Sequence, residues 1–166
     1  MSDQAPSLSW GHININVSDL DRSVAFYQKL GFEIFLPGIP YLGLSMKPSR
    51  MDAAAATALG LPAGVTARAC IMGLGRTFPK IDLIETDRLS PSPPLNNGDT
   101  GIVRLCLASA DLAGDHARLS AAGVDFISPP QTDGGGFAQI AVCADPDGAL
   151  IELIQIDRAR WAASGE

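Results

Sequence analysis

The sequence has little positive charge, no long apolar run and few cysteines, and each shortage excludes a class of protein. Twelve Lys and Arg against 18 Asp and Glu give a net charge of −6, so no basic face is available for nucleic-acid phosphates. No apolar stretch approaches the roughly 18–20 residues that a membrane-spanning helix needs. Residues 1–10 also lack the basic start and apolar core of a signal peptide. We therefore expect a soluble, cytoplasmic protein that binds neither nucleic acid nor membranes.

The three cysteines, Cys70, Cys106 and Cys143, stand singly inside apolar runs. An odd, unclustered set predicts buried reduced thiols, and indicates neither a disulfide framework nor a zinc site. Hydrophobic residues make up 46% of the chain and charged residues 18%, which is enough apolar material for a substantial core. With 17 Gly and 12 Pro, the chain has many turns, so strands should contribute heavily.

Two stretches of the chain are alike. "WGHININVSDL" (residues 10–20) matches "GIVRLCLASADL" (101–112), and each Asp-Leu pair is followed, 12 residues after its Asp, by a glycine, Gly31 or Gly123. Asp19 can cap a helix by accepting backbone N–H bonds, and a glycine after a helix favours a left-handed C-cap. Each copy thus predicts a strand, a helix and a strand, at residues 12–17, 20–30 and 32–36, and again at 103–108, 112–122 and 124–127.

Each copy continues with two more apolar strands, so the chain predicts two βαβββ modules. These strands are expected at residues 69–74 and 80–84, and at 138–143 and 149–154. Module one spans about 9–88, a linker 89–101, and module two about 102–156. Module one carries an insertion at about 47–68, whose alanine-rich run ending in Gly60 predicts a short helix. The insertion could be a lid or binding loop, a surface excursion or a dimer contact.

The sequence resembles the vicinal oxygen chelate superfamily, which includes glyoxalase I, bleomycin-resistance proteins and extradiol dioxygenases. "GHININVSDLDRSVAFYQKLGF" (11–32) and "ADPDGALIELIQ" (144–155) carry the resemblance. It implies an α+β fold in which two βαβββ modules form a curved mixed-sheet cup around a small-molecule ligand, and a homodimer. Metal-dependent members use the first and last strand of each module. Those positions correspond here to His12, Asp82, Arg104 and Glu152, with Glu85 as the alternative to Asp82.

Alternation along the first strand favours a polar ligand site. His12, Asn14 and Asn16 share one face, and the intervening residues are apolar. We therefore predict His12 as a catalytic residue and both asparagines as ligand-binding residues, although neighbouring polar groups could instead satisfy the histidine. Asp82 and Glu152 stand in apolar strands, where a carboxylate needs a partner, because desolvating its charge is costly.

Arg104 decides between metal-dependent and metal-free chemistry. A guanidinium has only donors, so it cannot bind a metal, and its charge repels a divalent cation. His12, Asp82 and Glu152 could still form a metal site if Arg104 turned away, but the sequence favours no cofactor. Arg104 could pair with Glu152 or Asp82, or receive a ligand carboxylate or enolate. Glu152 or His12 would then act as the catalytic base.

Two function classes follow from these residues. The first is a lyase or isomerase that acts on a small carbonyl or carboxylate compound, and the inward-facing charges favour it slightly. The second is a binding or sequestering protein of the bleomycin-resistance type, without turnover. Extradiol dioxygenase activity is disfavoured, because Arg104 replaces a histidine that its iron site requires.

Overall fold

The computed structural model describes residues 7–90 and 92–163. They form two compact units of α+β structure, one ending at Ser90 (unit one) and the other beginning after it (unit two). Strands and helices occur in the order that the repeat predicts, which confirms the expected fold class. No helix in the described part of the chain is long and apolar enough to cross a membrane.

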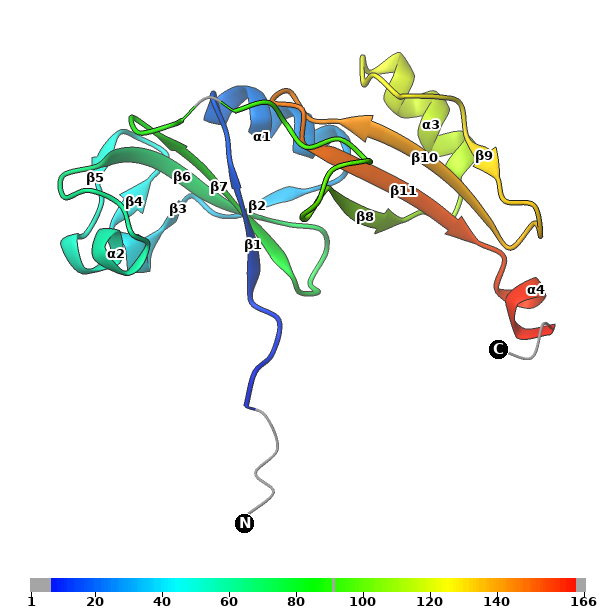
Figure 1. The fold of residues 1–166 in the computed structure, drawn as a ribbon, viewed down its shortest axis with the longest axis horizontal. Helices are drawn as coiled ribbons and strands as arrows, with labels where there is room; N and C mark the ends of the chain where they lie inside the picture. The colour runs from blue at the N-terminus through cyan, green and yellow to red at the C-terminus, as the bar shows by residue number, and fades with distance from the viewer. Residues whose placement is uncertain (1–6, 91, 164–166) are drawn as a thin grey trace, which may run out of the picture. The chain divides into compact units, whose positions relative to one another are not determined.

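Unit one is built on a mixed sheet (Figure 1). Its strands are β1 (His12–Asn16), β2 (Glu33–Leu36), β6 (Thr66–Gly73) and β7 (Lys80–Thr86), in the order β1-β7-β6-β2. The β1–β7 pair is parallel and the other pairs are antiparallel, with the short β5 (Ser49–Arg50) added to β6. Helix α1 (Leu20–Lys29) packs against β7, where Leu20 and Leu83 are fully buried.

The insertion of unit one is part of its core. It contains α2 (Ala53–Ala58), and β3 (Gly38–Ile39), η1 (Pro40–Leu42) and β4 (Leu44–Ser45) precede it. Asp52 caps α2 and Gly60 follows it at φ +67°, as the alanine-rich run predicts. Ten buried residues form one cluster between these segments and the sheet: Ile39, Leu42, Leu44, Met51, Ala56, Val65, Ala67, Ala69, Ile71 and Ile84. The insertion is therefore packed onto the sheet, and it is not an exposed excursion.

Unit two repeats the strand order of unit one. Its elements are β8 (Arg104–Ala108), α3 (Leu112–Ala121), β9 (Gln131–Thr132), β10 (Ala138–Ala144), β11 (Leu150–Ile156) and α4 (Arg158–Ala163). The sheet order is β8-β11-β10-β9, with β8 parallel to β11, and α3 packs against β10 and β11 (Figure 1).

The prediction of a strand at residues 124–127 is wrong. Only Phe126 makes a bridge there, to Cys143. Pro129 and Pro130 follow at once, and proline has no N–H to donate to a ladder. Pairing with β10 therefore resumes only at β9, which takes the place that β2 has in unit one.

The last strand of each unit also holds the start of its helix. Glu85 on β7 accepts the Leu20 N–H at 2.7 Å, and Gln155 on β11 accepts the Leu112 N–H at 2.7 Å. Glu85 also pairs with Arg68 at 2.9 Å. Glu85 therefore faces α1, on the opposite side of β7 from Asp82, and the alternative alignment that made it a metal ligand is wrong.

Candidate functional site

Strands β1 and β7 bring four of the predicted site residues to one sheet face in unit one: His12, Asn14, Asn16 and Asp82. His12, Asn14 and Asn16 are exposed along β1, whereas Ile13 and Ile15 are half-buried. In the parallel register His12 lies beside Lys80, and Asn14 beside Asp82. This face lies opposite the one that packs on α1, since side chains alternate along a strand.

Asp82 is the centre of a small polar cluster. Its side chain is 1% exposed, and its Oδ2 atom accepts a hydrogen bond of 2.9 Å from the Tyr41 hydroxyl. The Nε2 atom of His12 lies 3.5 Å from the same oxygen, and the His12 side chain is 45% exposed. The Oδ1 atom of Asp82 is buried without a hydrogen-bond partner. A buried carboxylate thus supports a histidine that solvent and small molecules can reach.

Burial and hydrogen bonding shift the pKa of Asp82 in opposite directions. Burial raises the pKa of Asp82 above its usual value, while the Tyr41 hydrogen bond and His12 act to lower it. Burial, together with the bond to Asp82 and its charge, raises the pKa of Tyr41 to about 12. Tyr41 therefore stays protonated at neutral pH and remains a hydrogen-bond donor.

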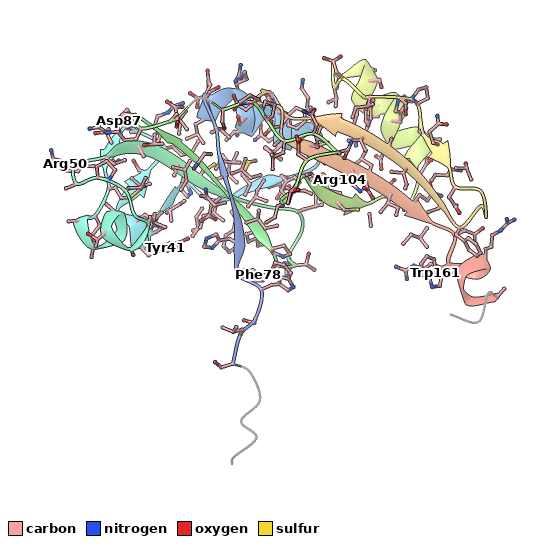
Figure 2. All side chains as sticks on the ribbon, viewed as in Figure 1. Tyr41, Arg50, Phe78, Asp87, Arg104 and Trp161 are labelled. Carbon is pink, nitrogen blue, oxygen red and sulfur yellow. The ribbon has the colours of Figure 1, made fainter. Side chains whose placement is uncertain are left out.

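Sequence reasoning missed Tyr41, which comes from η1 in the segment before the insertion (Figure 2). Its ring stacks on His12 with centroids 6.2 Å apart and planes at 28°. Ile39 and Leu42 on either side are buried, and Gly43 ends the turn at φ +70°. The sequence signal was a proline and a glycine enclosing a tyrosine, which predicts a tight turn but not its contact.

The two asparagines of β1 contact each other. The Asn14 amide donates to Asn16 Oδ1 at 3.1 Å, and both side chains lie at the exposed surface. Lys80, the register neighbour of His12, is buried, and its ammonium donates to the Gly75 carbonyl at 3.0 Å. That ammonium also lies 4.9 Å and 5.4 Å from the ring centroids of Phe35 and Phe78. Unit one thus places the cation of Lys80 on β7, the strand that pairs with the one carrying His12.

Arg104 and Glu152 form an ion pair in unit two. Arg104 Nε donates to Glu152 Oε2 at 2.5 Å, and Arg104 Nη1 donates to Asn97 Oδ1 at 2.9 Å. The side chains are 39% and 12% exposed, respectively. Of the two partners that the sequence offered to Arg104, the structure pairs it with Glu152; Figure 2 labels Arg104 at the start of β8.

Cys106 binds the other oxygen of Glu152. Its thiol donates to Oε1 at 3.4 Å, and partial desolvation together with the Glu152 charge raises the pKa of Cys106 to about 11. All three cysteines are free thiols; Cys70 and Cys143 are buried as predicted, but Cys106 is exposed. The prediction failed for Cys106 because β8 is an edge strand, and this residue lies on its open face.

The donor set of each unit does not fit a metal ion. Among the described residues, no group of three or more His, Cys, Asp or Glu comes together in a way that could hold one. In the described part of unit one, His12 and Asp82 are the two potential ligands that lie together, and one Asp82 oxygen already accepts the Tyr41 hydroxyl. In unit two both Glu152 oxygens are engaged, one of them by a cation. A metal would have to displace these donors, so we derive no chemistry through it.

Solved structures with this fold include several glyoxalase proteins. A glyoxalase family protein from Bacillus cereus has a TM-score of 0.74 at 15% identity, over 94% of this chain and 98% of that one. Glyoxalase I from Leishmania major has a TM-score of 0.59 at 21% identity, over 96% and 94% of the two chains. Glyoxalase I from Zea mays has a TM-score of 0.61 at 22% identity, and the match covers 87% of this chain but 43% of the maize protein.

No curated protein matches the chain. A family model described as Glyoxalase/Bleomycin resistance protein/Dioxygenase superfamily matches residues 9–153, which is most of the 166 residues. The match spans both copies of the repeat and includes His12, Asp82, Arg104 and Glu152. The chain therefore belongs to the glyoxalase, bleomycin resistance and dioxygenase superfamily.

Proposed function

We propose that this chain binds a small carbonyl or carboxylate compound and moves a proton on it without a metal ion, as a lyase or isomerase. The half-exposed His12 beside the buried carboxylate of Asp82 carries the proposal. An imidazole that a carboxylate orients is a common general base, since the carboxylate stabilises the imidazolium that forms.

In the proposed reaction, His12 removes a proton from the carbon beside the ligand carbonyl. Asp82 stabilises the resulting imidazolium, and Tyr41 holds the Asp82 carboxylate in place through its 2.9 Å hydrogen bond. His12 then returns the proton to another atom of the ligand, as in an isomerase, or to a leaving group, as in a lyase. Asn14 and Asn16 supply amide groups for ligand oxygens on the same face.

Arg104 and Glu152 receive different roles in this proposal. Arg104 is partly exposed, and its Nη2 atom has no hydrogen-bond partner in the described part of the chain. It can therefore receive a carboxylate oxygen of a ligand. Glu152 is held by Arg104 and Cys106, so we assign it to orienting Arg104, and the catalytic base to His12.

Proton exchange tests the catalytic proposal. Small 2-oxo acids, 2-hydroxy acids and aldehydes are incubated with the protein in D₂O, and loss of the carbon-bound proton signal is followed by NMR. We expect exchange with at least one compound, and its loss in His12→Gln. His116→Gln is the matched control, because this second histidine packs on Phe126 in unit two. Exchange that survives His12→Gln would refute the role of His12.

Elemental analysis tests the absence of a metal. Tag-free protein purified without chelator is compared with Arg104→His, which introduces the histidine that metal-dependent relatives use. We expect the wild type to contain much less than one divalent ion per chain, and the variant to gain one. Near-stoichiometric metal in the wild type would refute the metal-free proposal.

Binding without turnover is the second candidate function. The Arg104–Glu152 ion pair favours this candidate, because the charges of the two side chains neutralise each other and Glu152 is then not a free base. This candidate predicts compounds that raise the melting temperature but show no proton exchange. We further infer a homodimer, as the family resemblance implies, and a cytoplasmic location, as the unclustered cysteines indicate. Sedimentation equilibrium measures the association directly.

A further inference from the structure

An Asn-Gly pair lies beside Arg104 in unit two. Asn97 and Gly98 are the central residues of an exposed turn, which the Asp99 N–H closes by donating to the Asn96 carbonyl at 3.0 Å. The chain has four asparagines, Asn14, Asn16, Asn96 and Asn97, and only Asn97 precedes a glycine. The Asn97 side-chain oxygen is the atom that accepts the Arg104 Nη1 hydrogen bond.

We propose that Asn97 is a deamidation site, and that the carboxylate formed there prevents Arg104 from binding anionic ligands. The Gly98 nitrogen attacks Asn97 Cγ, and the bond between Cγ and the side-chain nitrogen breaks. Ammonia leaves with the former Gly98 amide proton, and a five-membered succinimide remains. Water then opens this ring at either carbonyl and leaves aspartate or isoaspartate. The reaction consumes one water molecule and needs no other co-reactant.

The structure leaves the attacking nitrogen accessible. The Gly98 N–H makes no hydrogen bond within the described residues, and a Cβ atom built on Gly98 would meet nothing within 4 Å. The other asparagines are less suited to ring closure. Asn14 and Asn16 stand in β1 before the β-branched Ile15 and Val17, and Asn96 precedes another asparagine.

Arg104 activates the carbon that is attacked. When Gly98 nitrogen adds to Asn97 Cγ, negative charge develops on Oδ1, and the guanidinium donates to that oxygen at 2.9 Å. A cationic donor placed at a developing oxyanion lowers the barrier to such an addition. The same contact leaves the side-chain nitrogen, which is the leaving group, without a bond to the guanidinium.

The product changes the surroundings of Arg104. A carboxylate at position 97 accepts the same hydrogen bond with a full negative charge, and such bonds are stronger than those to an amide. Arg104 would then lie between two carboxylates, and the formal net charge of −6 would become more negative. Loss of anion binding rests on the proposed function, in which Arg104 receives a ligand carboxylate; the modification itself does not.

Peptide mapping by mass spectrometry tests the modification. The protein is incubated at mildly alkaline pH, and conversion to aspartate and isoaspartate is quantified at all four asparagines. We expect conversion at Asn97 to exceed that at each of the others, and Arg104→Met to slow it about fivefold, the equivalent of one ordinary hydrogen bond. Equal rates at Asn96 and Asn97 would overturn the assignment, and an unchanged or faster rate in Arg104→Met would overturn the part given to Arg104.

A separate experiment tests the consequence. Acetate is titrated into wild type, Asn97→Asp and the uncharged control Asn97→Gln, and the Arg104 Nε–H resonance is followed by NMR. We expect acetate to shift this resonance in wild type and Asn97→Gln but not in Asn97→Asp. An equal shift in all three proteins would show that the new carboxylate does not prevent Arg104 from binding acetate. A shift in none would refute the anion-binding role of Arg104, while peptide mapping still decides on the modification.

Discussion

Replacing Tyr41 with phenylalanine should destabilise the protein by removing one hydrogen bond to a buried charge. The hydroxyl donates to Asp82 Oδ2 at 2.9 Å, and Asp82 Oδ1 already has no partner. The variant keeps the ring that stacks on His12, so the aromatic contact is retained.

The expected cost is about 1–2 kcal/mol. Hydrogen bonds to charged groups contribute about 1.5–3 kcal/mol, and we reduce that range by about a third because Tyr41 is 58% exposed and water can partly replace its hydroxyl. The cost should also depend on pH, since the bond stabilises the ionised form of Asp82. It should be largest at neutral pH and shrink as acid protonates the carboxylate.

Urea denaturation measures this cost for wild type, Tyr41→Phe, Asp82→Asn and the double variant. In the Asp82→Asn background, Tyr41→Phe should lose only a bond between neutral groups, so the cycle should give a coupling energy of about 1 kcal/mol. A cost near zero at neutral pH would refute the reasoning. So would a coupling energy near zero, because it would show that the hydroxyl does not stabilise the carboxylate.

Three further predictions concern Asp82, Arg104, Glu152 and Cys106. Burial raises the folded pKa of Asp82 above its unfolded value of 3.8, so the folded state holds the proton more tightly and stability falls as pH rises from the unfolded through the folded pKa. Asp82→Asn should remove this decrease in the free energy of unfolding, which urea denaturation at a series of pH values measures. An unchanged slope of that free energy against pH would contradict the raised pKa. Arg104→Met should cost about 2 kcal/mol and Glu152→Gln about 1 kcal/mol in the same assay, because only the former leaves a mostly buried carboxylate without its cation; equal costs would argue against the pair. Cys106, whose pKa lies at about 11, should react slowly with a thiol reagent at neutral pH despite its exposure, and Glu152→Gln should speed the reaction by removing the neighbouring charge, whereas equal rates would exclude that electrostatic effect.

The repeated elements could be predicted because they depend on local signals. Asp19 caps α1 by accepting the Arg22 N–H at 3.0 Å, and Asp111 caps α3 by accepting the Gly114 N–H at 3.0 Å. Helix caps, glycine C-caps and alternation of polar and apolar residues act over a few positions, so the sequence alone shows them. The strand at 124–127 was predicted from its match to the first copy of the repeat, and the two prolines after it outweighed that signal.

The placement of charge on β1 and β8 was also readable from the sequence. Alternation put His12 and the asparagines on one face, and the chemistry of a guanidinium set Arg104 apart from any metal ligand. The pairing of Arg104 with Glu152 remained one of two options, because a partner 48 positions away depends on which strands become neighbours.

By itself, the sequence determined the two βαβββ repeats, their helix caps and the residue types on the first strand of each. Only the tertiary structure brought Tyr41 to Asp82 across 41 positions, and Asn97 to Arg104 from the segment before β8. The turn at Tyr41 is held by Ile39 and Leu42, which pack in the core of unit one. Such contacts depend on how distant segments pack, and no periodicity in the sequence encodes them.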